Sequence, residues 1–345
     1  MEPFVKALPP VIFGTSSFGN LFVVLSDEVK LQIVTECIRH TNGKLIFDSA
    51  GKYGAGLALE SLGKCLRKLG VAPEDVIISN KLGWMRTELK TPEPTFEPGV
   101  WRDLKHDAIQ NISFNGIIEC FEQGNELLGG YIPAMVSVHD PDEYLSEARS
   151  PAEYEKLYGD ILEAYGALEM LKKEGRVRAI GIGAKNWRSI ARIANDVNLD
   201  WVMIANSMTI KSHPRPLLDF MRQLEKKGVQ IINSAVFHSG YLTGGDYFDY
   251  KLISPNTAEN RILQSWREVF FKLCADFKIK PAEACVRFAL MAPGVKSIAL
   301  STTNPNRVKE NVAMAEKVIP QKFWLKMISE GLVDEIYFNN LDIKS

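Results

Sequence analysis

The sequence has no dominant charge and no long apolar run. Of its 345 residues, 41 are Lys or Arg and 42 are Asp or Glu, so the formal net charge is −1. A protein of nucleic acids or anionic membranes normally carries a basic excess or patch, and none is visible. No apolar run approaches the roughly 20 residues of a membrane span. The N-terminal MEPFVKALPPVIFG lacks the basic and apolar regions of a signal peptide. We therefore expect a cytoplasmic protein without nucleic-acid or membrane partners.

Cysteine is scarce and scattered. The five cysteines show no CxxC or other ligand-like spacing: Cys37, Cys65, Cys120, Cys274 and Cys285. Most of them fall in helix-like segments, where cysteine usually behaves as a small buried apolar residue. This usage is typical of a reducing compartment and predicts neither a disulfide framework nor a metal site.

What the chain does have is enough apolar sequence, 46% of its residues, for a large core. Short β-branched runs alternate with helical patterns. There are eight such runs: Val11–Gly14, Leu45–Phe47, Val76–Ser79, Met135–Val138, Ala179–Ile182, Trp201–Ile204, Val229–Ile232 and Val295–Leu300. Eight strands alternating with helices predict parallel βαβ repeats. No linker divides the chain, so we expect one α/β domain over 1–345, a (β/α)8 TIM barrel.

Two connections are longer than a minimal strand-to-helix link. One runs from Gly83 to about Ile112, and the other from Gly240 to about Asn260. Long connections inside a compact domain are more often functional than not. Both follow a predicted strand, so on a barrel they would lie on the face where active sites form.

Four polar residues are candidates for chemistry. Asp48, Lys81 and His139 end the strand-like runs LIFD, VIISNK and MVSVH, and Tyr53 follows in the Gly-rich FDSAGKYGAG. Each alone has an ordinary explanation, such as a turn carboxylate, a solvated lysine or a half-buried aromatic. Parallel barrels, however, gather the C-terminal strand ends at one face. The joint placement predicts a proton-transfer site.

The four side chains suit distinct roles in such a site. A phenol has a reference pKa of about 10, so Tyr53 alone is a weak acid or base at neutral pH. A nearby ammonium favours the phenolate and lowers that pKa, which is the role expected of Lys81. Asp48 would pair with Lys81, and His139 would orient a substrate oxygen. Proton transfer to or from a carbonyl or hydroxyl oxygen follows, with no metal ligand required.

In this order the four residues resemble the catalytic tetrad of the aldo-keto reductase superfamily. The resemblance covers nearly the whole chain and includes FGTSSFGN, SNKLGW, VHDPD, RVRAIGIGAKNW, SGYLTGG and STTNPNRVKEN. It implies a (β/α)8 barrel with a nicotinamide cofactor extended across its mouth. Hydride would pass between the nicotinamide and a carbonyl carbon, while Tyr53 handles the proton of the oxygen.

Within that superfamily the chain looks closest to the aldose 1-dehydrogenases of L-fucose, D-arabinose or galactose-like sugars. The segments LKTPEPTFEPGVW, SAVFHSGYLTGG and ANSMTI carry this likeness. The resemblance implies oxidation of the anomeric C1 hydroxyl of an aldose to the lactone. Phe18, Trp84 and Trp187 would wall the sugar site, since aromatic faces suit the CH-rich face of a pyranose; core packing is the alternative for all three.

The family pattern for the adenosine end of the cofactor matches Ser301 to Asn311. Arg307, Glu310 and Asn311 are retained and Thr302 lies within the stretch, but Ser301 replaces the first basic residue. Because Lys and Arg bind a 2′-phosphate by charge-assisted bonds, the resemblance implies NAD or NADP with NAD favoured.

Other cofactor contacts follow from the same resemblance. The expected residues are Gly14, Thr15, Asn186, Asn206, Ser234, Ser239, Gly240 and Leu242. The usual Ser-Asn pair for the carboxamide appears as Lys185-Asn186, and the usual glutamine after the sixth strand as Ala205, with Asn206 next to it. These departures fit the sugar dehydrogenases better than the steroid or aldose reductases.

Other functions remain open at this point. The same barrel serves as an NAD(P)H-dependent aldehyde or ketone reductase, as a pyridoxal dehydrogenase, or as a nucleotide-sensing regulatory subunit. His139-Asp140-Pro141-Asp142 offers ligands for a divalent ion, although we expect no metal. The expected partner is a small sugar, and the expected state is a monomer or small homo-oligomer.

Overall fold

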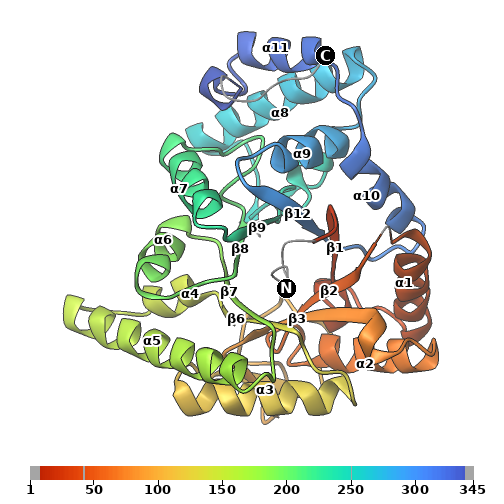
Figure 1. Cartoon of the computed structure of the whole chain (residues 1–345). Coiled ribbons are helices and arrows are strands. Elements are labelled where there is room, and N and C mark those ends of the chain that lie inside the picture. The colour runs from red at the N-terminus through yellow and green to blue at the C-terminus, as the bar shows by residue number, and fades with distance from the viewer. Residues whose placement is uncertain (1–7, 42, 250, 339–345) are drawn as a thin grey trace.

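Eight parallel strands close into a barrel in the computed structural model, which describes residues 8–41, 43–249 and 251–338. The strands are β1 (Val11–Gly14), β2 (Leu45–Ala50), β3 (Val76–Leu82), β6 (Met135–His139), β7 (Ala179–Ala184), β8 (Trp201–Ala205), β9 (Gln230–Ser234) and β12 (Val295–Leu300). Figure 1 looks along the barrel and shows the first strand beside the last, because β1 pairs with both β12 and β2. The predicted (β/α)8 barrel is confirmed, and each predicted run corresponds to one strand.

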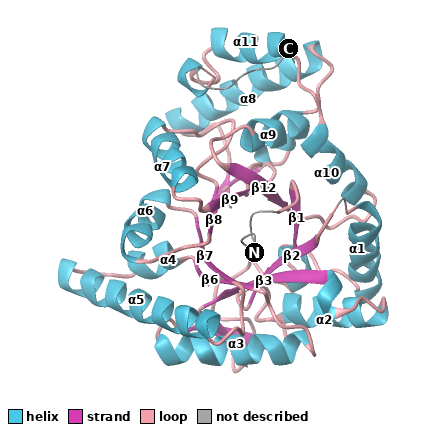
Figure 2. Cartoon of the chain, viewed as in Figure 1, coloured by secondary structure: helices cyan, strands magenta, loops and turns pink. Residues whose placement is uncertain are grey.

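Helices form the outer ring (Figure 2). They are α1 (Asp27–His40), α2 (Leu57–Lys68), α3 (Phe114–Leu128), α4 (Pro141–Ser146), α5 (Pro151–Lys173), α6 (Trp187–Asp196), α7 (Arg215–Lys226), α8 (Ala258–Asp276), α9 (Pro281–Leu290), α10 (Arg307–Glu316) and α11 (Gln321–Ser329). α8 lies against α9 and α11 against α8, so these two helices thicken the wall on one side. No helix in the described ranges combines the length and the apolar character that a bilayer span requires.

Local sequence explains where the helices begin, end and face. The Ser26 side chain caps α1 by accepting from the Val29 amide at 3.3 Å. α2 buries Leu59, Leu62 and Leu66 completely and stops before Gly70, whose φ of +66° favours glycine. In α5, by contrast, Leu162 is 37% exposed, because its neighbour Ile161 lies on the face that packs against the barrel. All five cysteines are buried, as expected from their scattered positions.

The barrel interior changes character along its axis. Side chains of one strand alternate between the interior and the helical layer. An apolar cluster including Ile12, Ile46, Met135, Trp201 and Ile232 fills the interior near the strand beginnings. Two or four residues further on, the same inward positions carry polar or very small residues. The chemistry of the barrel is therefore confined to the C-terminal ends of its strands.

Both long connections contain secondary structure of their own. The first forms an antiparallel hairpin of β4 (Trp84–Glu88) and β5 (His106–Gln110). The second contains the short pair β10 (Tyr247–Phe248) and β11 (Lys251–Leu252). Since they leave the C-terminal ends of β3 and β9, both begin on the face that holds Asp48, Lys81 and His139.

Candidate active site

A buried ion pair lies at the centre of the site. Lys81 Nζ is 2.6 Å from Asp48 Oδ2, and each residue is only 3% exposed. The ammonium also donates to the Ser49 carbonyl at 3.2 Å, and the Ser79 hydroxyl donates to Asp48 Oδ1 at 3.1 Å. These partners fix the position of the ammonium, since a buried charge is stable only when it is paired and hydrogen-bonded.

Tyr53 lies next to both this ion pair and His139. Lys81 Nζ is 4.8 Å from the centroid of the Tyr53 ring. The rings of Tyr53 and His139 meet edge to face with centroids 5.5 Å apart. The structure thus brings all four predicted catalytic side chains together, with a cation close to the phenol as the expected chemistry requires.

Close backbone contact holds the loop of Tyr53. A Cβ on Gly54 would lie 2.3 Å from the Gly19 carbonyl oxygen, and a Cβ on Gly51 would lie 2.4 Å from the Trp84 carbonyl oxygen. Real Cβ atoms do not approach backbone this closely, so both positions require glycine. Tyr53 is therefore placed by the turn after β1 on one side and by the start of β4 on the other.

Replacing Gly54 by alanine tests this placement. We expect a loss of about 2–4 kcal/mol in the free energy of unfolding, from the backbone strain and the forced contact together. Gly70→Ala is the matched control, because Gly70 has a similar φ of +66° against +61° and a Cβ added there would meet no atom within 4 Å. Urea unfolding of both variants measures the difference; equal losses would contradict the contact with Gly19.

His139 is neutral in this setting. Burial lowers the pKa of its imidazole well below the ordinary value, and the cations of Lys81 and Lys52 lower it further. Its Nδ1 is buried and has no hydrogen-bond partner among the residues that the structure describes. A neutral imidazole has one N–H donor and one acceptor nitrogen, so it can form a hydrogen bond with a substrate oxygen through whichever nitrogen faces the site.

A second buried lysine, Lys52, lies close to the tetrad and was not predicted from the sequence. Lys52 Nζ lies 2.7 Å from Glu143 Oε2, 2.9 Å from Glu97 Oε1 and 3.7 Å from Asp140 Oδ2. Lys185 joins the cluster through Glu143 at 2.5 Å. No local signal marks this network, because its members come from four different connections.

Aromatic residues of the first long connection cover Tyr53. The Trp101 ring centroid is 6.0 Å from that of Tyr53, and Phe96 lies between Trp101 and Trp84 at 6.3 and 5.8 Å. The Trp101 indole donates to Glu97 at 2.7 Å. Trp84 therefore belongs to an aromatic group that also includes Phe96 and Trp101, and its place at a sugar site remains a prediction.

Three residues that were predicted to contact the sugar or the cofactor have side chains buried in the protein interior. Phe18 is 1% exposed and belongs to the core between the barrel and α2, so the prediction that it walls the sugar site is wrong. Thr15 is fully buried, and both its amide and its hydroxyl donate to the Asp48 carbonyl at 3.0 Å. Leu242 is fully buried in the main core, so only its backbone is left for a cofactor.

Trp187 packs with the helices. Its ring lies 6.2 Å from that of Phe220 in α7, with the Arg188 guanidinium 4.8 Å from its centroid. Asn186 is exposed and caps α6 by accepting from the Arg188 amide at 3.0 Å. The roles predicted for these two residues remain predictions.

Two residues expected to contact the cofactor, Ser239 and Gly240, lie where the second long connection begins. Asn206 donates to Asp249 at 2.9 Å, and the same carboxylate oxygen lies 2.9 Å from His238 Nδ1. Ser239 and Gly240 follow in the left-handed backbone region, with φ of +56° and +91°. One carboxylate thus ties this connection to the ends of β8 and β9.

The predicted adenosine residues lie after β12. Ser301 is exposed, and its hydroxyl lies 3.3 Å from that of Ser17. The Thr302 hydroxyl donates to the Asn304 carbonyl at 3.2 Å. Arg307, Glu310 and Asn311 occupy the first turns of α10, with Arg307 exposed at its first position.

The residues that point into the barrel at the C-terminal ends of its strands suit a nicotinamide lying beside the tetrad. On β2, β3 and β6 the inward positions carry Asp48, Lys81 and His139. Further round the rim they carry small residues, among them Gly183, Ala205, Ser234 and Gly14. This half of the rim presents little beyond backbone, which suits a flat ring lying next to the proton-transfer group.

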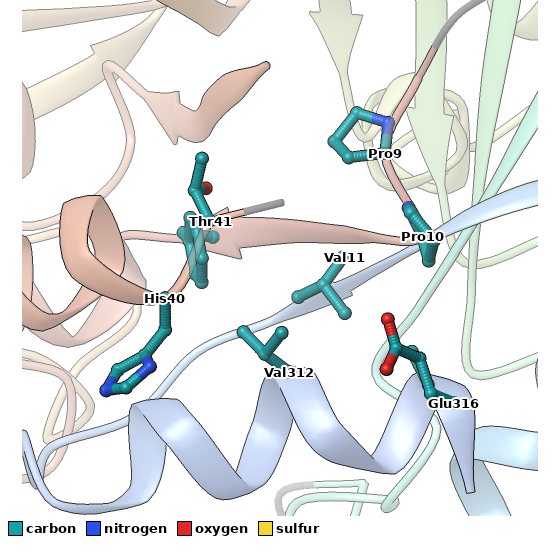
Figure 3. A pocket seen from close by; sticks show the side chains of 9 residues that line it. Pro9, Pro10, Val11, His40, Thr41, Val312 and Glu316 are labelled. Carbon is teal, nitrogen blue, oxygen red and sulfur yellow. The ribbon is translucent and has the colours of Figure 1, made fainter. Parts of the chain in front are cut away.

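A separate small hollow lies toward the opposite end of the barrel, between the start of β1 and the C-terminal ends of α1 and α10. Figure 3 shows Val11 and Val312 within its lining. It contains none of the tetrad.

Within the described ranges, no three His, Cys, Asp or Glu side chains form a metal-binding group. Of the motif considered for a divalent ion, Asp140 faces Lys52 and Asp142 accepts two backbone amides.

Comparison with known proteins identifies the class that this geometry defines. The Aldo/keto reductase family matches residues 10–329, and the chain belongs to that family. It is an oxidoreductase of the kind that uses NAD(H) or NADP(H) with small-molecule substrates.

Its relatives are distant but match over most of their length. The chain is 26% identical to a pyridoxal 4-dehydrogenase from Microbacterium luteolum, over 93% of each chain. It is 24% identical to a D-threo-aldose 1-dehydrogenase from a Pseudomonas species, over 95% of each chain. An aldo-keto reductase structure from Bacillus halodurans superposes with a TM-score of 0.65 at 19% identity, covering 94% of this chain and 92% of that one.

Proposed function

We propose that the protein is an NAD(P)-dependent aldose 1-dehydrogenase that oxidises the anomeric C1 hydroxyl of a sugar to the lactone. The observation that carries this proposal is the buried Lys81 ammonium, held by Asp48 at 2.6 Å and lying 4.8 Å from the Tyr53 ring. The small residues Gly183, Ala205, Ser234 and Gly14 at the barrel rim would hold a nicotinamide cofactor, which would supply the hydride acceptor for C1. Tyr53 removes the hydroxyl proton of the same carbon, and the carbonyl of the lactone forms as the C–H bond breaks.

Each remaining residue of the tetrad supports that transfer. Lys81 stabilises the phenolate form of Tyr53, because a cation nearby favours the charged state of a phenol. Asp48 keeps Lys81 in place and compensates its charge in a buried position. Neutral His139 holds the reacting oxygen by a hydrogen bond, which places it within reach of Tyr53.

A sugar is favoured by the character of the surroundings. Glu97 and Glu143 keep about a third of their side-chain surface exposed, and both pair with the Lys52 ammonium, which lies 5.1 Å from the Trp84 ring centroid. Carboxylates accept hydrogen bonds from hydroxyls, and an aromatic face suits the CH groups of a pyranose. The likeness to D-threo-aldose 1-dehydrogenase supports the same substrate class.

Pyridoxal is the second candidate. The likeness to a pyridoxal 4-dehydrogenase and the aromatic group of Trp84, Phe96 and Trp101 both favour a flat ring. Pyridoxal closes on its own hydroxymethyl group to a hemiacetal, so it presents the same H–C–O–H unit as a cyclic aldose. The catalytic residues would act on it in the same way.

A substrate panel separates these candidates. L-fucose, D-arabinose, D-galactose and pyridoxal are each incubated with the protein and NAD⁺ or NADP⁺, and nicotinamide reduction is followed at 340 nm. Aldehydes with NADPH form the reductase arm. Turnover of an aldose, with lactone detected by mass spectrometry, supports the proposal. Activity with pyridoxal alone, or only in the reductase arm, would replace it.

We further propose that NAD is preferred, because Ser301 stands where family members carry a basic residue. Ser301→Arg should raise kcat/KM for NADP⁺ relative to NAD⁺ about tenfold or more, as one charge-assisted bond to the 2′-phosphate would provide. Ser301→Gln is the control of similar bulk without charge. An unchanged ratio in Ser301→Arg would show that this position does not face the 2′-position of the cofactor.

A further inference from the structure

Lys52 is a buried cation surrounded by three carboxylates from two other connections. Only 3% of the residue is exposed. Its ammonium lies 2.9 Å from Glu97 in the first long connection, 2.7 Å from Glu143 in α4 and 3.7 Å from Asp140 just after β6. It also lies 5.1 Å from the centroid of Trp84. One side chain therefore links the Tyr53 loop to both the hairpin connection and the end of β6.

Lys52 stays charged in this environment. Burial by itself would lower the pKa of Lys52, but Asp140, Glu97 and Glu143 outweigh burial and raise that pKa above its ordinary value. The cation occupies the centre of the three carboxylates. It is thus unable to serve as a free anchor for an anionic substrate, and its contacts are structural in the first instance.

Two of its partners have strained backbone. Asp140 and Glu97 have φ of +45° and +44°, in the left-handed region that residues with a Cβ seldom adopt. Such conformations persist only where the surroundings over-determine them, and they concentrate at functional sites. Here the contact that both strained residues share is the Lys52 ammonium.

The cluster is connected to the chemistry through the chain itself. Lys52 directly precedes Tyr53, and Asp140 directly follows His139. Asp140 Oδ2 also lies 3.6 Å from His139 Nε2. A contact between Lys52 and Asp140 therefore constrains the two residues whose rings meet at 5.5 Å.

We propose that Lys52 is a positioning residue, which sets the spacing of Tyr53 and His139 and holds the 83–112 connection over them. Its kinetic consequences rest on the proposed function, whereas its geometric ones do not. Lys52→Met would leave three carboxylates without their shared cation, so their mutual repulsion would separate the Tyr53 loop from the end of β6. A shift of about 1 Å in such a pair is enough to reduce turnover roughly a hundredfold.

The same substitution changes the charges around His139. The groups that face it are Lys81 on β3, Lys52 and Tyr53 in the loop after β2, Asp140 and Glu143 after β6, and Lys185 after β7. Losing Lys52 removes one cation and leaves the carboxylates. The protonated imidazole then becomes more favourable, so His139 should bind a proton at higher pH than in the wild type.

Proton NMR of protein labelled at histidine Cε1 tests the geometry without any substrate. The chain has five histidines, and His139→Gln assigns the relevant signal by its disappearance. In Lys52→Met we expect weaker cross-peaks between His139 and the Tyr53 ring, and a proton affinity of His139 raised roughly tenfold. Lys52→Arg, which keeps the charge, should restore both. Lys64→Met, at an exposed lysine of α2, should change neither.

Kinetics supply the second readout once a substrate is known. Lys52→Met should lower kcat roughly 10- to 100-fold and leave the Kd of the cofactor within about twofold, while Lys52→Arg recovers most of the activity. If Lys52→Met does not fold, Glu97→Gln serves, since it removes one ion pair and keeps an acceptor for Trp101. A folded Lys52→Met with unchanged cross-peaks and His139 titration would overturn the proposal. Absence of wild-type turnover across the panel would reject the proposed function alone.

Discussion

Replacing Tyr53 by phenylalanine should lower kcat about 10²- to 10⁴-fold, the usual contribution of a positioned general acid or base. The substitution removes only the hydroxyl. The ring keeps its contacts with His139 at 5.5 Å and Trp101 at 6.0 Å, so the shape of the site is preserved. Cofactor binding, followed by quenching of tryptophan fluorescence, should change less than twofold. Steady-state kinetics with the best substrate of the panel measure the loss.

Tyr131→Phe is the matched control for this experiment. Tyr131 is buried and donates to the Val71 carbonyl at 2.7 Å, in the helical layer outside the barrel. The same atom is removed there, so a stability loss of about 1 kcal/mol is expected with no effect on kcat. If Tyr53→Phe kept more than a fifth of the wild-type turnover, proton transfer would have to be assigned to another group.

The barrel and the tetrad were predictable because both depend on local signals. Each strand appears as a short β-branched run, and alternation along it decides which side chain faces inward. Asp48, Lys81 and His139 share the inward parity of Ile46, Ile77 and Met135 on their strands. Closure of the barrel then brings the three strand ends together whatever their separation in the sequence.

What sequence reasoning missed depends on contacts between loops. Lys52 pairs with residues of two later connections, and nothing in FDSAGKYGAG distinguishes it from a solvated lysine. Phe18 is expected to wall the sugar site because an aromatic face suits a pyranose, yet the turn after β1 directs its ring into the core beside α2. Trp101 and Phe96 cover Tyr53 only because the hairpin of β4 and β5 turns their segment back over the site. Loop direction carries no periodic signal from which it could have been read.

The stability of the protein should depend strongly on charge balance between Asp48 and Lys81. Asp48→Asn leaves the Lys81 ammonium buried without its carboxylate, while the Ser49 carbonyl at 3.2 Å still accepts from it. Removing one member of a buried ion pair typically costs about 3–5 kcal/mol, because the other charge stays uncompensated. Lys81→Met should cost a similar amount, moderated by the hydrogen bond that Ser79 donates to Asp48. Urea unfolding of each variant measures these losses.

The double variant Asp48→Asn with Lys81→Met distinguishes a stabilising pair from a functional one. Neither charge remains to be desolvated, so the loss in unfolding free energy should be no larger than that of either single variant and well below their sum. Activity should behave differently: all three variants should be impaired, because Tyr53 lacks a correctly held cation in each. Strictly additive stability losses would contradict the buried pair at 2.6 Å. Recovery of turnover in the double variant would show that Lys81 does not tune Tyr53. Stability regained without activity is therefore the result expected if this ion pair is retained for proton transfer rather than for folding.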